Sequence, residues 1–147
     1  MFGKQKKKII GKRLLKADYR QQKDELGNAI VHYLARRDLI YKQNFDPFYE
    51  VEDFNSVGAF QKLPIHLAAQ FGSNSDDITR LYQDTRLKLH QDVKGKNVLE
   101  LAILNENENI RSRTVKGLIT VLKKSYSGQT LVNSYHLIIN FGQVMEC

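Results

Sequence analysis

The sequence predicts an all-α protein made of stacked repeats, and three observations lead to this fold class. The segment around His32 recurs around His66 and again around Glu100, and the two intervals are equal. A constant period of this size is typical of units that pack on their neighbours rather than around one central core. The second and third units also carry apolar stripes at helical spacing. We therefore expect stacked helical pairs that grip another protein, a binding module rather than an enzyme.

The first helix of each unit should be short, with small side chains that let neighbouring helices approach closely. The expected helices cover residues 30–37, 64–71 and 98–105. Pro64 suits a first turn, since its missing N–H would have no partner there. Asn97 can cap the third of these helices, whereas Ala29 and Leu63 occupy the equivalent place and cannot. Those two helix starts should each be weaker by about 1 kcal/mol.

The second helix is clearest in the second and third units. Ser75 is the expected N-cap in the second unit, with Asp76 and Asp77 in the first turn, where carboxylates favour the helix dipole. The stripes that should face the core are Ile78, Leu81, Tyr82 and Thr85 in the second unit and Val115, Leu118, Ile119 and Leu122 in the third. These spacings predict two amphipathic helices.

The first unit is irregular where its second helix should lie. Pro47 should stop any helix there, because its ring clashes with the preceding turn. Residues 47–60 then form a longer connection, which Phe48, Tyr49 and Phe54 should anchor. Before the third unit, Gly95 gives a polar turn the backbone freedom that it needs.

The chain divides into a basic amino-terminal segment and an array of units. The expected boundaries are residues 1–23 for the segment and 24–147 for the array, with units near 24–57, 58–91 and 92–124 and a partial unit over 125–147. Asn133 continues the phase, but the residues after it lack the paired alanines. We expect a degenerate closing unit there, and a strand-like or disordered tail is the alternative.

The net charge of +7 belongs to the amino-terminal segment alone. Residues 1–23 hold nine basic side chains and one acidic one, whereas the other 124 residues hold 14 basic and 15 acidic ones. A nearly neutral body argues against nucleic-acid binding, which spreads basic residues over a folded face. Three roles of the segment stay open: a solvated tail or capping helix, a contact with an anionic surface, or a nuclear-import-like cluster of Lys6, Lys7, Lys8, Lys12 and Arg13.

The sequence holds no pattern that indicates catalysis, a cofactor or a metal ion. His90, His136 and Cys147 have no partner at ligand spacing, and neither a nucleophile elbow nor a phosphate loop is present. The single cysteine suits a reducing compartment, the cytoplasm or the nucleus. No apolar run is long enough to cross a membrane, and the lysine-rich start lacks the apolar stretch of a secretory signal.

The repeated segment resembles the ankyrin repeat, whose unit is a turn and two antiparallel helices of about 33 residues. The family pattern Asp-x-x-Gly-x-Thr-Pro-Leu-His-x-Ala-Ala-x-x-Gly is matched by Asp24, Gly27, His32 and Ala35, by Pro64, His66, Ala68, Ala69 and Gly72, and by Asp92, Gly95, Leu99 and Ala102. Glu100 replaces the family histidine and Gln61 replaces the turn glycine. The resemblance covers about residues 24–133 and implies an ankyrin-repeat solenoid of three repeats plus a degenerate fourth, in which His32 and His66 brace neighbouring units.

Within that family the chain is similar to the ankyrin proteins of polydnaviruses, which resemble inhibitor-of-κB proteins. The segment 27–35, the long connection after it and the Pro-Ile-His-Leu-Ala-Ala motif at residues 64–69 carry this likeness. It implies a viral inhibitor that docks on Rel/NF-κB-type transcription factors of the host and blocks their DNA binding or nuclear entry. The alternatives are a generic ankyrin adaptor for another host protein and a nuclear factor targeted by its basic amino-terminus.

The chain also departs from the cellular inhibitors that this likeness brings in. Those proteins carry a phosphorylatable Asp-Ser-Gly degron before the repeats, but no serine precedes Ser56 here. They end in an acidic, proline-rich tail, but the last proline here is Pro64. The resemblance therefore implies an inhibitor that signalling cannot remove.

The same resemblance places the partner-binding face on the turn tips and on the outward positions of the first helices. These positions are Glu25, Leu26, Asn28, Arg36, Arg37, Phe60, Lys62, Gln70, Phe71, Val93, Lys94, Lys96, Leu104 and Asn105. Phe60 and Phe71 are the strongest anchor candidates, because aromatic side chains supply much of the energy at interfaces. The alternative is that one or both are buried between units.

Overall fold

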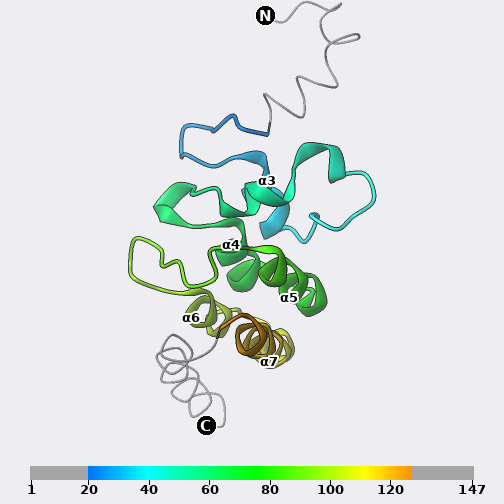
Figure 1. The fold of residues 1–147 in the computed structure, drawn as a ribbon, viewed down its shortest axis with the longest axis vertical. Coiled ribbons are helices and arrows are strands. Elements are labelled where there is room, and N and C mark those ends of the chain that lie inside the picture. Colours follow the sequence, from blue (N-terminus) through cyan, green and yellow to red (C-terminus); the bar gives the residue numbers. More distant parts are fainter. Residues whose placement is uncertain (1–19, 127–147) are drawn as a thin grey trace, which may run out of the picture.

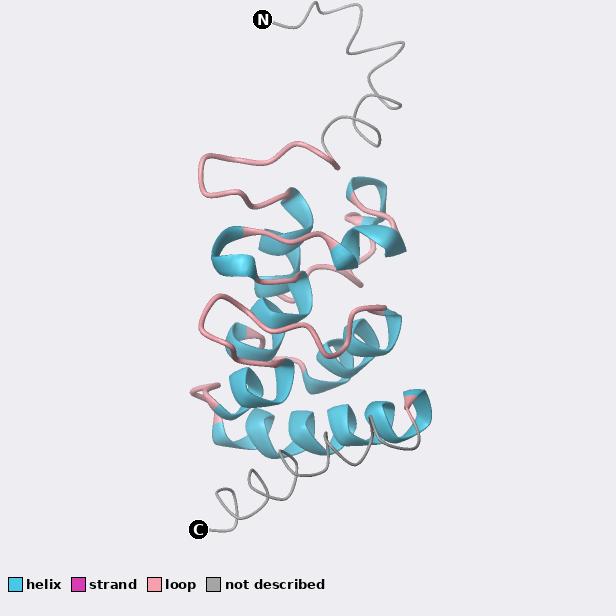
Figure 2. Ribbon diagram, turned by 60° about the vertical axis from the view of Figure 1, so that its left-hand side comes forward, coloured by secondary structure: helices cyan, strands magenta, loops and turns pink. Residues whose placement is uncertain are grey.

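The protein is a stack of helices, and its computed structural model describes residues 20–126. Within that range it is all-α and contains no strand, so the predicted fold class is confirmed at this level (Figure 2). The inner helices α3 (Ile30–Arg36), α4 (Pro64–Phe71) and α6 (Val98–Ile103) pack on one another in chain order (Figure 1). The outer helices α5 (Ser75–Asp84) and α7 (Glu108–Ser125) pack against each other and against α4 and α6 respectively.

The inner helices stack closely because small side chains lie between them. Ala35, Ala68 and Ala102 are all buried, as expected from the repeated segment. Two of the predicted helix ends were slightly too long: α3 ends at Arg36, and α6 ends at Ile103 rather than at residue 105.

The start of α5 corrects one prediction. Asn74, not Ser75, is the N-cap: its side-chain oxygen accepts a hydrogen bond of 3.0 Å from the N–H of Asp77, and Ser75 is the first helical residue. The predicted apolar stripe is buried as expected. Thr85, its last member, lies just after the helix and donates its hydroxyl proton to the carbonyl of Leu81 at 2.7 Å.

Helix α7 packs on α5 through its predicted stripe and through one glycine. Val115, Leu118 and Leu122 are buried, while Ile119 is half-buried. At Gly117 the helices come so close that a β-carbon would lie 3.1 Å from Cγ2 of Thr79, and nearer still to its hydroxyl. A larger residue at position 117 would push the outer helices apart.

The first unit has no outer α-helix among its described residues. The connection instead contains short 3-10 turns over Asp46–Phe48, Val51–Asn55 and Ala59–Gln61. The turn Val51–Asn55 packs against α4 and α5, so the connection fills the place above α5 (Figure 1). Phe54 is buried there, with its ring centroid 5.5 Å from that of Tyr49, and the predicted aromatic anchoring is confirmed.

Acidic residues of this connection hold the end of the basic amino-terminal segment. The guanidinium of Arg20 forms ion pairs with Glu50 at 2.9 Å, Glu52 at 3.0 Å and Asp53 at 3.1 Å. The predictions for the cluster at residues 6–13 and for the closing unit after residue 126 lie outside the described residues.

Candidate protein-binding groove

Each inner helix follows a turn, and the first and third turns are built in the same way. In both, an aspartate, Asp24 or Asp92, accepts hydrogen bonds of 2.9–3.0 Å from the N–H groups two and four residues later. Three residues after the aspartate, Gly27 and Gly95 adopt φ angles of 95° and 76°, which glycine tolerates best. The repeat seen in the sequence is thus also present in the structure of these two turns.

The middle turn keeps one backbone hydrogen bond of the other two turns, but it has different residues and a different conformation at its tip. The N–H of Gly58 donates to the carbonyl of Lys62 at 2.8 Å, as its counterparts Asp24 and Asp92 do four residues along their own turns. Phe60 and Gln61 both have a φ of 58°. Gln61 therefore stands in the left-handed conformation that the equivalent glycines adopt without strain.

We expect the substitution Gln61→Gly to stabilise the protein by about 0.5–1 kcal/mol, because relief of the left-handed strain exceeds the added freedom of the unfolded chain. Urea unfolding measures the change. Gln61→Ala is the matched control: it removes the same exposed side chain but keeps a β-carbon, so its stability should stay near that of the parent. Equal effects of the two variants would contradict this account.

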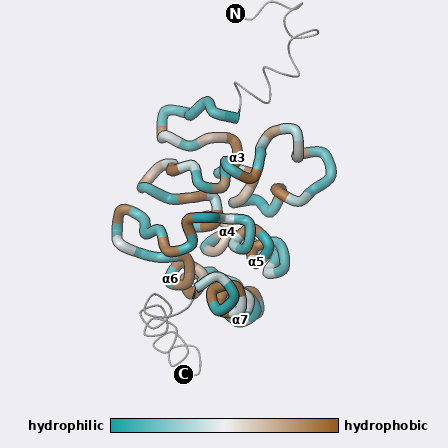
Figure 3. Tube along the Cα trace, viewed as in Figure 1, coloured by the Kyte–Doolittle hydropathy of each residue, from teal (hydrophilic) through white to brown (hydrophobic). Residues whose placement is uncertain are grey.

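Hydrogen bonds tie the three turns together tip to tip. The side-chain oxygen of Asn28 accepts from the N–H of Ala59 at 2.9 Å, and the N–H of Val93 donates to the carbonyl of Phe60 at 2.8 Å. Lys62 adds an ion pair to Asp92 at 2.8 Å. Figure 1 shows these loops projecting on one side of the stack, and Figure 3 shows apolar stretches in the loops as well as in the helices.

His32 and His66 brace the stack behind the turns. Both side chains are buried, and Nδ1 of each accepts a hydrogen bond from the N–H three residues earlier, at 3.0 Å and 3.1 Å. The other ring nitrogen, Nε2, therefore carries the proton, and it donates to the carbonyl 24 residues later, Ser56 at 2.9 Å or His90 at 3.0 Å. Both histidines thus have the structural role that was predicted, but only His32 reaches the next unit, through a contact of 3.2 Å to the carbonyl of Lys62, because His90 lies in the same unit as His66.

In the third unit, Glu100 makes only the first of the two hydrogen bonds that each histidine makes, the one to the N–H three residues earlier. Its carboxylate accepts a hydrogen bond of 3.1 Å from the N–H of Asn97, whose side chain in turn accepts from the N–H of Glu100 at 2.9 Å. This reciprocal capping box begins α6, and the predicted cap at Asn97 is confirmed. Ala29 and Leu63 make no side-chain cap, as expected, but the histidine rings satisfy their N–H groups.

Stability should fall in mild acid because of these rings. Burial lowers the pKa of His66 to about 4 and also lowers the pKa of His32, whereas an unfolded histidine titrates near 6.5. The unfolded state therefore takes up the protons first, so the contribution of each ring is fully present above about pH 6.5 and is lost as the pH falls towards 4. Urea unfolding at about pH 5 should show about 2 kcal/mol less stability than at pH 7.5 from His66 alone.

The variant Glu100→Ala keeps both histidines and should lose a similar amount between these pH values. A free energy of unfolding that is equal at the two pH values would contradict the neutral, buried state of the rings.

A groove of about 420 Å³ lies between the turns and the inner helices. Eleven of the fourteen residues predicted for partner binding line it: Leu26, Asn28, Arg36, Phe60, Lys62, Gln70, Phe71, Val93, Lys94, Lys96 and Leu104. The sequence reasoning missed Tyr33, Ala59, Leu67, Asp92 and Leu101, which complete the lining. Tyr33, Leu67 and Leu101 occupy the same position in the three units, so the repeat itself could have identified them.

Three predicted residues do not line the groove. Glu25 and Arg37 are exposed elsewhere on the surface. Asn105 is buried, and its amide donates to the carbonyls of Ala69 at 3.1 Å and Gly72 at 2.9 Å. Asn105 therefore joins the ends of α6 and α4 rather than presenting a side chain to a partner.

The exposed large apolar side chains are concentrated in this groove. Six of the nine that are exposed among residues 20–126 line it, including Phe60 and Phe71, which are 68% and 44% exposed. The alternative that these two rings are buried between units is therefore wrong. The guanidinium of Arg36 lies 4.0 Å from the centre of the Phe71 ring and covers one of its faces. An apolar, concave surface of this kind is suited to binding another protein.

In residues 20–126 no group of three histidine, cysteine, aspartate or glutamate side chains could hold a metal ion, and no helix is long and apolar enough to cross a membrane. No family model, curated protein or solved structure matches the chain.

Proposed function

We propose that this chain is an ankyrin-repeat protein that acts as a non-catalytic protein-binding module. The repeat pattern of the sequence supports this, together with turns that recur once in each unit and histidines that bridge to carbonyls 24 residues later. The groove carries the binding function: it gathers six exposed apolar side chains between turns that hydrogen bonds hold in place.

The proposed partner is a Rel/NF-κB-type transcription factor of a host cell, and the chain is a viral, inhibitor-of-κB-like suppressor of it. The likeness of residues 27–35 and 64–69 to the polydnavirus ankyrin proteins supports this choice. The mechanism is occlusion: the bound module covers the surface that the factor needs for DNA binding or nuclear entry.

Co-elution of the purified chain with a Rel-homology domain tests the proposal. We expect one complex at micromolar concentration, and its loss in the variant Phe60→Ser, because a central exposed aromatic is a strong anchor. Val51→Ser is the matched control, since Val51 is exposed but lies outside the groove. Two separate elution peaks for the parent chain would reject the Rel-type partner.

The basic cluster in residues 4–16 supports a second candidate, a nuclear factor whose amino-terminus is an import address. Deletion of residues 1–16 separates the two proposals. Loss of nuclear accumulation with Rel binding intact would make the cluster an address that accompanies the first function, and a generic ankyrin adaptor remains if neither property is found.

A further inference from the structure

The charges in the groove do not balance. Its lining holds four cations, Arg36, Lys62, Lys94 and Lys96, and one anion, Asp92. Lys62 and Asp92 pair with each other at 2.8 Å. Among residues 20–126 the other three cations form no ion pair, so the groove carries three positive charges that no described residue compensates.

These charges are unevenly distributed along the stack. Leu26, Phe60 and Lys94 are equivalent positions at the tips of the three turns, one in each unit. The first two tips are therefore apolar, and the third is cationic, with Lys96 beside it. Arg36 is the exception near the first unit, and it is already stacked on Phe71. The unpaired lysines therefore lie at the end of the groove that the third unit forms, beside the exposed side chains of Val93 and Leu104, whereas the tips of the first two units carry no charge.

We propose that the groove binds a segment of a partner protein in which large apolar side chains are followed by acidic ones, and this rests on the proposed protein-binding function. The apolar part lies against the tips at Leu26 and Phe60, and the carboxylates face Lys94 and Lys96. A purely apolar segment would remove two ammonium groups from water without a partner, which is costly. A basic segment would meet like charges.

The apolar content of the groove separates this occupant from a nucleic acid. A phosphate backbone needs a succession of cations along its track. Here the apolar side chains Leu26, Phe60 and Phe71 interrupt the track, and the free lysines occupy one end only. A phosphate backbone would therefore make no favourable contact with most of the residues that line the groove.

Selection of a random phage-displayed peptide library on the full-length chain tests this inference. We expect enriched peptides to combine aromatic or leucine residues with a net negative charge. Enrichment of neutral or basic peptides would overturn the proposal, and so would selection that enriches no sequence at all.

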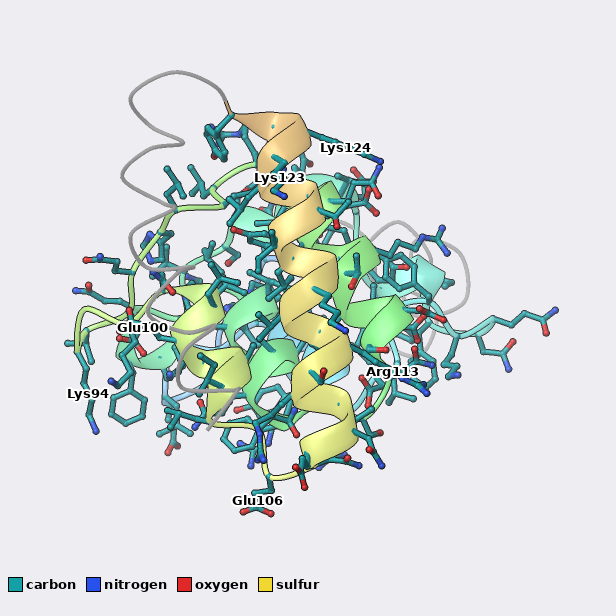
Figure 4. The ribbon with its side chains drawn as sticks, turned by 90° about the horizontal axis from the view of Figure 1, so that it is seen from below. Lys94, Glu100, Glu106, Arg113, Lys123 and Lys124 are labelled. Atoms are coloured by element: carbon teal, nitrogen blue, oxygen red, sulfur yellow. The ribbon has the colours of Figure 1, made fainter. Side chains whose placement is uncertain are left out.

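Charge reversal locates the binding site. Lys94→Glu together with Lys96→Glu should lower binding of the selected acidic peptides at least about tenfold and should shift a fresh selection towards basic peptides. The matched control is Arg113→Glu with Lys116→Glu, which makes the same charge change on α7, on the side away from Lys94 (Figure 4). Equal losses in both double variants would show a general effect of charge and reject the groove as the site.

The co-elution experiment with the Rel-homology domain keeps the two proposals apart. Acidic peptides that bind the groove of a chain that does not bind the Rel domain would reject that partner and leave this inference intact. A Rel complex that is unaffected by Lys94→Glu and Lys96→Glu, with no acidic peptides selected, would reject the inference and leave the proposed function intact.

Discussion

The variant His66→Ala should lose about 3 kcal/mol of stability, a large part of the roughly 5–15 kcal/mol that holds a typical domain together. The ring is fully buried and joins the N–H of Leu63 to the carbonyl of His90. Its removal leaves both backbone groups without a partner in the interior and opens a cavity where the ring was. Urea unfolding followed by circular dichroism measures the loss.

Glu100 provides the internal control for this prediction. It occupies the equivalent place in the third unit, but it is only half-buried and its side chain satisfies a single N–H. We expect Glu100→Ala to cost about 1 kcal/mol, the usual value for a lost cap interaction. Should the two variants lose the same amount, the hydrogen bond from His66 to the carbonyl of His90 would contribute nothing to stability.

The variant Gly58→Ala should cost about 2–3 kcal/mol, although its backbone φ of −108° is accessible to alanine. The added β-carbon would lie 2.6 Å from Nε2 of His32 and would overlap the side-chain oxygen of Asn28. Both atoms are engaged, one with the carbonyl of Ser56 and the other with the N–H of Ala59, so neither can move away freely. Thermal or urea unfolding measures the effect.

Gly95→Ala separates steric overlap from backbone strain. A β-carbon at Gly95 would meet no atom within 4 Å, but its φ of 76° is unfavourable for alanine. The expected cost is about 1–2 kcal/mol from conformation alone. If Gly95→Ala proved the more harmful change, crowding around His32 would not explain the need for glycine at position 58.

Positions 58 and 61 show that the residue found at the equivalent place in other units is not always the more stable choice. The first and third turns carry aspartate where the second carries Gly58, so the repeat itself suggests aspartate there. The neighbours of Gly58 exclude any side chain, and restoration of the aspartate should destabilise the protein. At Gln61, three residues later, restoration of the repeat's glycine should stabilise it. Whether such a substitution stabilises or destabilises the protein depends on the atoms that lie beside the position.

The sequence was most informative where one period acts on many residues together. The equal spacing of His32, His66 and Glu100 identified the inner helices, and the stripe from Ile78 to Tyr82 identified α5. Most of the groove lining was located through the resemblance to the ankyrin repeat, which implies a binding face on the turn tips and on the outward positions of the first helices. A regular period thus predicts which way each side chain points, and so whether it is buried.

The errors occur where a single contact outside the period decides the outcome. Asn74 caps α5 although Ser75 is an equally good capping residue, because the helix begins one residue earlier than the pattern required. Asn105 turns inward because the carbonyls of Ala69 and Gly72 lie within its reach, and no pattern along the chain records that proximity. The connection over residues 47–60 was predicted, but the packing of its turn Val51–Asn55 against α4 and α5 was not.

The bonds between neighbouring turns have a consequence for recognition. Because Asn28, Phe60 and Lys62 each engage the next turn, the wall that faces the groove is fixed before any partner arrives. A preorganised surface loses little conformational entropy on association, so more of the contact energy remains as affinity. Leu26 and Phe60 can thus stay exposed without the loops collapsing over them, as the proposed binding function requires.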